Sequence, residues 1–217
     1  MHKNALIFLM LILVGCSPES ESNVEPSKQT QINHNIVPTD NADWALKNAD
    51  IIFSSTKIDS KGNHIEEMGN FTEYSAFFNK KGQFKLEIDL ASVNTNIIIR
   101  DQRIRDWLFE TETFTTASIT SNLDAEQINQ LKLNESIQIT QPITLDLHGI
   151  QSNLDADLII TRIEPSILSV KTNQPVILSV ANFGMKNGLQ KMTEVMNLSE
   201  ILPDIPITFK GEFFRPL

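Results

Sequence analysis

Side chains that could perform acid–base or metal chemistry are scattered through this sequence. Asp155 and Asp157 are two positions apart, so in a strand both carboxyl groups face one side, as a general acid and base would require. The same alternation puts them on the polar face of that strand, and we interpret them as solvated surface residues. His64 and His148 stand singly, without the HExxH or His-x-His spacing of metal sites. We therefore expect no catalytic residues, no metal ligands and no enzymatic activity.

Cys16 is the single cysteine of the chain and follows directly after an apolar run. Lys3 makes the N-terminus positive, and positions 5–14 (ALIFLMLILV) are all apolar. A helix needs about 20 apolar residues to cross a bilayer, so this shorter run predicts a signal peptide. LVGC at positions 13–16 is similar to a bacterial lipobox, in which the cysteine thiol becomes acylated. We therefore expect residues 1–16 to be a lipoprotein signal peptide and the acylated cysteine to hold the protein on a membrane.

Positions 17–40 are rich in serine, glutamate, asparagine and glutamine and show no apolar period. Such a segment buries too little surface to offset the entropy cost of ordering it, so we expect a disordered tether. Ser17 stands where the inner-membrane retention signal of enteric bacteria would place aspartate. The sequence thus predicts a protein of the Gram-negative cell envelope, anchored to the outer membrane and facing the periplasm.

The chain as a whole has the composition of a globular protein, with 41% apolar residues and a formal net charge of −9. That composition excludes collagen-like and wholly disordered chains. An acidic chain without a Lys/Arg cluster repels phosphate, so we expect no nucleic-acid partner. Residues 41–217 are long enough to form one folded domain with its own core.

Period-two alternation dominates positions 41–217. Over 84–90, apolar residues alternate with Lys85, Glu87 and Asp89, so one face of this strand is buried. The same pattern recurs over 137–148, 154–160 and 205–213, and more weakly over 50–58, 68–78, 113–123, 166–172 and 175–181. Short, regularly spaced strands of this kind predict an all-β sandwich or an up-and-down barrel.

Two segments have helical spacing instead. Residues 97–109 combine apolar residues with Arg and Asp and predict a short amphipathic helix. Residues 185–202 place methionines and leucines on one stripe, and Pro203 is expected to end that helix. Such a stripe fits a core, and because methionine is adaptable it also fits a lid over a lipid cavity.

Several stretches in the domain match one known family. They are IDLASVNT at 88–95, RDQRIR at 100–105, LFE at 108–110, PITLDLHG at 142–149, NFGM at 182–185 and IPITF at 205–209. Together they resemble the YceI-like family over about residues 44–215. The resemblance implies an antiparallel, eight-stranded, extended lipocalin-like barrel with one or two short helices packed on it. It also implies that the barrel interior binds a polyisoprenoid or quinone-like lipid.

Strand parity and this resemblance together suggest the residues that would line such a cavity. The candidates are Phe53, Phe77, Ile88, Leu90, Leu108, Phe114, Ile143, Leu145 and Phe209, with Met192 and Met196 as a lid. The same residues would also fill a solid core, because a lining and a core have the same composition.

Two hypotheses follow. In the first, the protein binds an isoprenoid or similar amphiphilic lipid without catalysis, for carriage or sequestration. We expect no cofactor, although the barrel could hold a bound isoprenoid lipid or quinone. In the second, a filled barrel is the scaffold of a structural lipoprotein whose acidic outer face engages an envelope protein. The sequence identifies no protein partner and leaves a homodimer open.

Overall fold

The computed structural model describes residues 42–215. They belong to one of the two compact units of the chain, Ile36–Leu217. The predicted signal peptide, Cys16 and the predicted tether at 17–40 lie outside the described residues and stay predictions. The helices of the described part are too short or too polar to cross a membrane.

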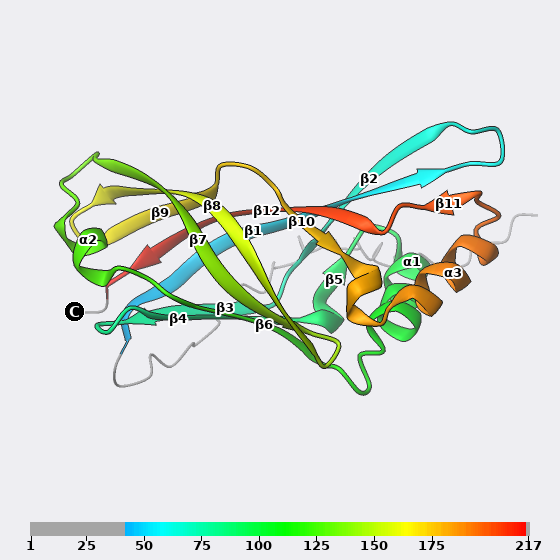
Figure 1. Cartoon of the computed structure of the whole chain (residues 1–217), viewed down its shortest axis with the longest axis horizontal. Helices are drawn as coiled ribbons and strands as arrows, with labels where there is room; N and C mark the ends of the chain where they lie inside the picture. The colour runs from blue at the N-terminus through cyan, green and yellow to red at the C-terminus, as the bar shows by residue number, and fades with distance from the viewer. Residues whose placement is uncertain (1–41, 216–217) are drawn as a thin grey trace, which may run out of the picture. The chain divides into compact units, whose positions relative to one another are not determined.

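Eight antiparallel strands close into a barrel (Figure 1). In chain order they are β1 (Ala42–Ile58), β3 (Tyr74–Asn79), β4 (Gln83–Asp89), β6 (Thr116–Asn122), β7 (Ser136–Leu147), β8 (Ile150–Glu164), β9 (Ile167–Thr172) and β12 (Asp204–Phe214). Each pairs with the next, and β12 pairs back with β1 from Ala45↔Phe214 to Phe53↔Ile207, which closes the ring. The predicted eight-stranded fold is confirmed.

Four further strands extend the barrel wall. β2 (His64–Phe71) pairs with the second half of β1, and β5 (Val93–Asn94) pairs with β2. β10 (Val176–Ser179) pairs with the start of β12, and β11 (Glu200–Ile201) pairs with the end of β1. These additions lengthen the wall towards the end that holds α1 and α3 in Figure 1.

The two ends of the barrel carry different helices (Figure 1). At one end α1 (Ile98–Arg103) continues into the π-helix η2 (Ile104–Phe109), and α3 (Lys186–Val195) packs on η2. The short 3-10 helices η1 (Leu90–Ser92) and η3 (Val180–Phe183) complete the described helices near this end. At the other end lies α2 (Ala125–Gln130), which the alternation pattern did not predict.

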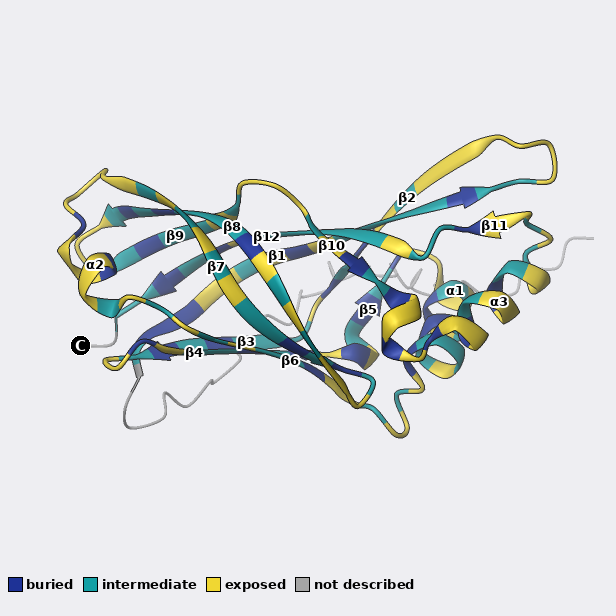
Figure 2. Cartoon of the chain, in the orientation of Figure 1, coloured by how far each residue is buried: buried dark blue, intermediate teal, exposed yellow. Residues whose placement is uncertain are grey.

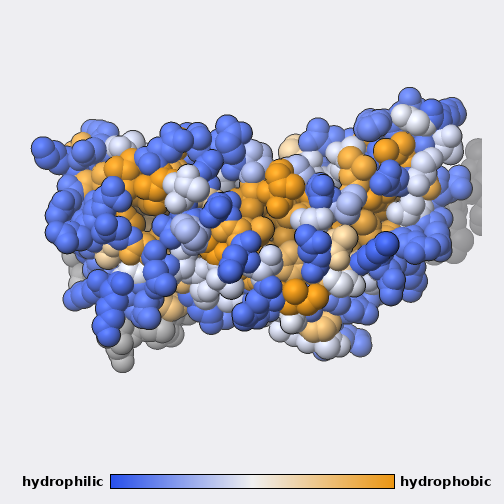
Figure 3. All heavy atoms as spheres, viewed as in Figure 1, coloured by the Kyte–Doolittle hydropathy of each residue, from blue (hydrophilic) through white to orange (hydrophobic). Residues whose placement is uncertain are grey.

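The predicted alternation is visible in the burial of the strands (Figure 2). Leu86 is buried and pairs with Ala76 on one side and Ile119 on the other, so apolar residues of three strands share the inner face. Lys85 lies on the outer face and forms a salt bridge with Glu87. Hydrophobic residues also reach the surface over β7, β8 and β10, between more hydrophilic regions (Figure 3); exposed Ile150 and Ile177 belong to these strands.

The helix expected over 97–109 is present, but its second half is π-helical. The helix expected over 185–202 is shorter than predicted and ends at Val195. There Asn197 adopts a left-handed φ of 51°, and the Leu198 N–H donates to the Thr193 carbonyl at 3.1 Å. This bond pattern caps a helix C-terminus, so asparagine, rather than Pro203, ends the helix. The chain then enters β11.

Candidate functional site: an apolar cavity inside the barrel

The barrel surrounds a cavity of about 250 Å³. Each of the eight barrel strands contributes inward-facing residues, and α1, η2 and α3 contribute more at one end. An eight-stranded barrel can be filled by side chains or can hold one small ligand. A space this large has room for many water-sized spheres, so side chains do not fill this barrel.

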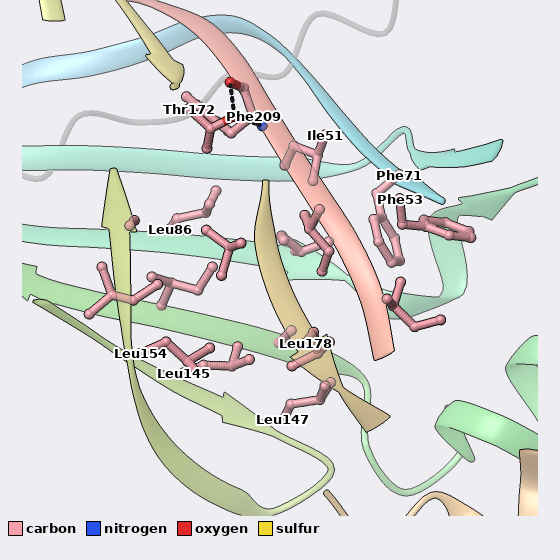
Figure 4. Close-up of a pocket in the computed structure, with 18 of the residues that line it drawn as sticks. Ile51, Phe53, Phe71, Leu86, Leu145, Leu147, Leu154, Thr172, Leu178 and Phe209 are labelled. Atoms are coloured by element: carbon pink, nitrogen blue, oxygen red, sulfur yellow. Dashed lines mark hydrogen bonds between the residues drawn. The ribbon is translucent and has the colours of Figure 1, made fainter. Parts of the chain in front are cut away.

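The walls of the cavity are almost entirely apolar. Figure 4 shows side chains from opposite strands pointing into one shared space: Ile51, Phe53, Phe71, Leu86, Leu145, Leu147, Leu154, Leu178 and Phe209. The polar Thr172 in this view is satisfied, because its hydroxyl accepts from the Phe209 N–H at 3.2 Å and donates to the Phe209 carbonyl. Such a surface is suited to hydrocarbon, whose contact with it removes apolar area from water.

The structure brings most of the sequence-predicted site residues to this cavity. Eight line it: Phe53, Ile88, Leu90, Leu108, Ile143, Leu145, Met192 and Phe209. They come from seven different elements, the strands β1, β4, β7 and β12 and the helices η1, η2 and α3. Their contact with a ligand stays a prediction.

Phe77 does not line the cavity. It pairs with Lys85 across the β3–β4 ladder, and directly opposed residues share a face, so Phe77 lies on the outer wall. Its neighbours Ala76 and Phe78 are the buried residues of β3. The assignment was wrong by one position because Phe77 and Phe78 are adjacent and equally apolar.

Phe114 and Met196 also lie away from the cavity lining. Phe114 precedes β6 and packs on His148, with 4.0 Å between the ring centroids, while the His148 Nε2 lies 2.8 Å from a Glu110 carboxylate oxygen. Met196 is the C-terminal cap of α3, and the lid position that α3 provides is occupied by Leu189 and Met192. The helix ends before its stripe reaches Met196.

Gly69 shapes the wall beside Phe53. The two residues are paired across β1 and β2, and a Cβ on Gly69 would lie 2.3 Å from the Phe53 ring. The ring therefore lies against bare backbone, which is possible because glycine has no side chain.

The cavity has a polar end beneath α1. Along the inward row of β1, Ile51 and Phe53 are followed by Ser55 and Lys57, and all four line the cavity. The Lys57 ammonium contacts the Glu67 carboxylate of β2, and only 5% of Lys57 is exposed. Burial, and then the nearby charge of Arg100, lowers the pKa of Lys57 from 10.5 to about 8.

Arg100 of α1 meets the same carboxylate. Its two terminal nitrogens lie 2.8 and 3.0 Å from the two Glu67 oxygens. Burial lowers the pKa of Arg100, and the Asp101 carboxylate opposes that shift. Asp101 in turn accepts from the Thr95 N–H at 2.8 Å and from the Thr95 hydroxyl at 2.5 Å, which fixes the start of α1. We name Lys57, Glu67, Arg100 and Asp101 the helical-end cluster.

The opposite end is closed by Trp44 and Arg162. Trp44 is fully buried, with the guanidinium of Arg162 5.3 Å and that of Arg215 4.5 Å from its ring. Arg162 donates from Nε to the Leu131 carbonyl at 2.7 Å, and from its terminal nitrogens to the carbonyls of Pro165, Ile128 and Asn129. Ile128 of α2 lines the cavity at this end.

Neither buried cation was identified from the sequence, although the strand pattern places both on an inward row. Lys57 continues the inward row of Ile51 and Phe53, and Arg162 continues that of Leu158 and Ile160. A cation on an otherwise apolar inward row marks a place where a charge must find partners inside the protein.

Asp155 and Asp157, the two carboxylates with the spacing of an acid–base pair, do not line the cavity. Asp155 is exposed, and Asp157 accepts from the Thr140 hydroxyl at 2.6 Å on the neighbouring strand β7. Within residues 42–215, no group of three or more His, Cys, Asp or Glu side chains is placed to hold a metal ion.

Solved structures share this architecture. A polyisoprenoid-binding domain from Saccharophagus degradans, implicated in plant cell wall breakdown, is 28% identical with a TM-score of 0.76; the match covers 81% of this chain and 99% of that domain. BcnA of Burkholderia cenocepacia shares the fold at 14% identity and a TM-score of 0.57, over 76% of this chain and 95% of that one. No curated protein matches the sequence.

The model of the YceI-like domain matches residues 44–213, from the first barrel strand to the last. The segments that suggested this resemblance lie at positions with structural roles: Arg100 and Asp101 in the helical-end cluster, and the PITLDLHG stretch along β7. The chain belongs to the YceI-like family.

Proposed function

We propose that this protein binds an isoprenoid or similar amphiphilic lipid inside its barrel, without catalysis. The observation that carries this proposal is the apolar cavity, lined by every barrel strand. Each 100 Å² of lipid surface buried there would contribute about 2.5 kcal/mol. The likeness to a domain described as polyisoprenoid-binding supports the same ligand class. The alternative of a filled barrel acting as a scaffold is not favoured by this cavity.

We also propose where the protein is located and what it does with its lipid. An acylated Cys16 would anchor the protein to the outer membrane on its periplasmic side, and the tether would let the barrel reach the lipid surface. From there the barrel would carry or sequester its lipid, which membrane leaflets supply. A quinone fits this role as well as another prenyl lipid does.

Native mass spectrometry followed by organic extraction tests the proposal. The protein is purified from a quinone-producing Gram-negative bacterium and examined for a co-purifying lipid. We expect a prenyl-type lipid at close to one molecule per chain. A lipid-free mass that does not change after incubation with quinones and polyprenols would contradict the proposal.

Two tryptophan variants locate the binding site. Leu145→Trp adds a large ring inside the cavity and should abolish loading. Phe77→Trp is the matched control, because it adds a similar ring on the outer wall, and it should load like the wild type. Equal loading of two folded variants would place the lipid outside the barrel.

A further inference from the structure

The helical-end cluster is a polar site at one end of an apolar cavity. Lys57, Glu67 and Arg100 all line the same cavity as the apolar wall, so a lipid tail in the barrel would place its other end near them. Phe213 lines the cavity at the other end and pairs with Leu46 of β1, which is 11 residues before Lys57, or roughly 36 Å of extended strand. The two ends of the cavity are therefore far enough apart to act on different parts of one lipid.

Hydrogen-bond donors outnumber acceptors in this cluster. An ammonium group carries three N–H donors and a guanidinium five, and neither accepts. Across residues 42–215, the acceptor in contact with Lys57 and Arg100 is the single carboxylate of Glu67. The Thr95 hydroxyl donates to Asp101, and within the described residues it forms no hydrogen bond with Lys57 or Arg100. Remaining N–H groups at this end can be satisfied by acceptor atoms of a ligand.

The charges of the cluster already balance. Lys57 and Arg100 are positive, while Glu67 and Asp101 are negative, so the group is neutral when all four are ionised. Side chains of three of them are well shielded: 7% of Lys57, 14% of Arg100 and 30% of Glu67 is exposed. An anionic ligand would add an uncompensated charge in this shielded place, which is unfavourable.

The Trp44 end does not offer such a site. The nitrogens of Arg162 donate to four carbonyl oxygens, and its guanidinium packs near the Trp44 ring. Four of its five N–H groups are thus used within the protein. The Nε of Arg215, near Trp44, has no hydrogen-bond partner within the described residues, but Arg215 does not line the cavity. Lys57 and Arg100, by contrast, line the cavity and keep spare N–H donors at its helical end.

We propose that Lys57 and Arg100 form the head-group site of the cavity, and that it selects an uncharged head whose carbonyl or ether oxygens accept hydrogen bonds. This inference rests on the proposed lipid binding and specifies the ligand class further. The lipid would lie with its head beneath α1 and its tail directed towards Trp44.

A series of lipids with one C20 prenyl tail tests this inference. The probes are geranylgeranyl acetate, geranylgeranyl phosphate and the head-less hydrocarbon phytane, each competing for a fluorescent prenyl probe on delipidated protein. We expect the acetate to bind about tenfold more tightly than phytane, the gain of a hydrogen bond to a charged donor, and more tightly than the phosphate. A phosphate that binds more tightly than the acetate would overturn the choice of an uncharged head.

Variants identify the donor. Lys57→Met should remove most of the advantage of the acetate over phytane, whereas Lys85→Met, a lysine on the outer wall, should leave it unchanged. Glu67→Gln removes the balancing negative charge and should shift the preference towards the phosphate. Because the ranking of heads is measured on the wild type as well, it stands even if a variant does not fold.

The outcomes separate the two proposals. Tight binding of all three probes with no head-group preference would overturn the head-group site and leave lipid binding intact. Failure of the wild type to bind any probe would overturn lipid binding itself. A head-group preference that Lys57→Met leaves unchanged would also overturn the assignment.

Discussion

Each end of the cavity has a buried cation, but the two cations differ in how many hydrogen bonds they form within the protein. Lys57 and Arg162 are both cations on the inward row of a long strand, and both are at least nine-tenths buried. Arg162 is surrounded by carbonyl oxygens that accept its N–H groups, and it packs near Trp44. Lys57 has Glu67 as its contact and shares that carboxylate with Arg100.

The two ends of the barrel therefore have different roles: one is closed by hydrogen bonds within the protein, and the other can bind a ligand. A buried polar group that forms most of its hydrogen bonds within the protein holds the fold together, whereas one with several spare donors stabilises little until a ligand supplies the acceptors. We therefore assign Arg162 to the architecture of the domain and Lys57 to its binding site. Substitutions at the two ends should have different effects on stability.

The largest effect is expected for Arg162→Met. This change leaves the carbonyls of Leu131 and Pro165 without the donor that Arg162 supplies, whereas the Ile128 carbonyl keeps the Leu131 N–H. It also removes the cation beside Trp44. The free energy of unfolding should fall by about 3–5 kcal/mol, measured by urea denaturation. A loss below about 1 kcal/mol would show that Arg162 does not close this end.

An intermediate effect is expected for Gly188→Ala at the helical end. A Cβ at Gly188 would lie 1.9 Å from the Trp107 carbonyl oxygen and 2.9 Å from the Leu108 Cα, and backbone cannot move aside as a side chain can. We expect α3 to separate from η2, with a loss of about 2 kcal/mol in stability.

The matched control for this variant is Gly62→Ala. Gly62 also lacks a side chain, but nothing lies within 4 Å of a Cβ there, and its φ of 83° is the source of any strain. If Gly188→Ala unfolds no more easily than Gly62→Ala, the close contact between α3 and η2 is not what holds this end.

The smallest effect is expected for Lys57→Met. Glu67 keeps its two contacts with Arg100, so the change leaves no buried carboxylate without a partner. At pH 7 the free energy of unfolding should change by less than about 1 kcal/mol, in contrast to Arg162→Met. A loss as large as that of Arg162→Met would remove the distinction between the two ends.

The same variant yields a pH dependence whose sign follows from the lowered pKa. Lys57 titrates at about pH 8 in the folded protein and near 10.5 when unfolded, so between these values the unfolded state binds more protons. The free energy of unfolding of the wild type should therefore rise, relative to Lys57→Met, as the pH increases from 8 to 9.5. Parallel curves for the two proteins would mean that the burial of Lys57 does not disfavour its charge.

Much of this fold could be predicted from the sequence, because apolar and polar residues alternate along the barrel strands. Leu86 and Ile88, or Leu145 and Leu147, could be placed on the inner face since each alternates with polar residues. Phe77 could not be placed on one face from the sequence, because it is adjacent to a second phenylalanine and either of the two could point inwards. The pairing with β4 decides between them. The short helix α2 was not predicted because its six residues give too little period.

The candidate site was only partly predictable for a different reason. Parity determines which residues point inwards but says nothing of whether they meet, and the open space depends on the curvature of all eight strands together. Lys57 and Glu67 are brought together by the β1–β2 pairing, in which Ser55 opposes Glu67. Arg100 joins them from α1, whose position over the barrel end no local pattern indicates.

A crystal structure of the protein carrying geranylgeranyl acetate would show whether a lipid lies in the barrel and which way its head points. We expect density for one lipid within the barrel, with its tail between Leu86 and Leu145 and its carbonyl oxygen within hydrogen-bond distance of Lys57 or Arg100. An interior occupied by water, or a lipid reversed with its head beside Trp44, would contradict this expectation.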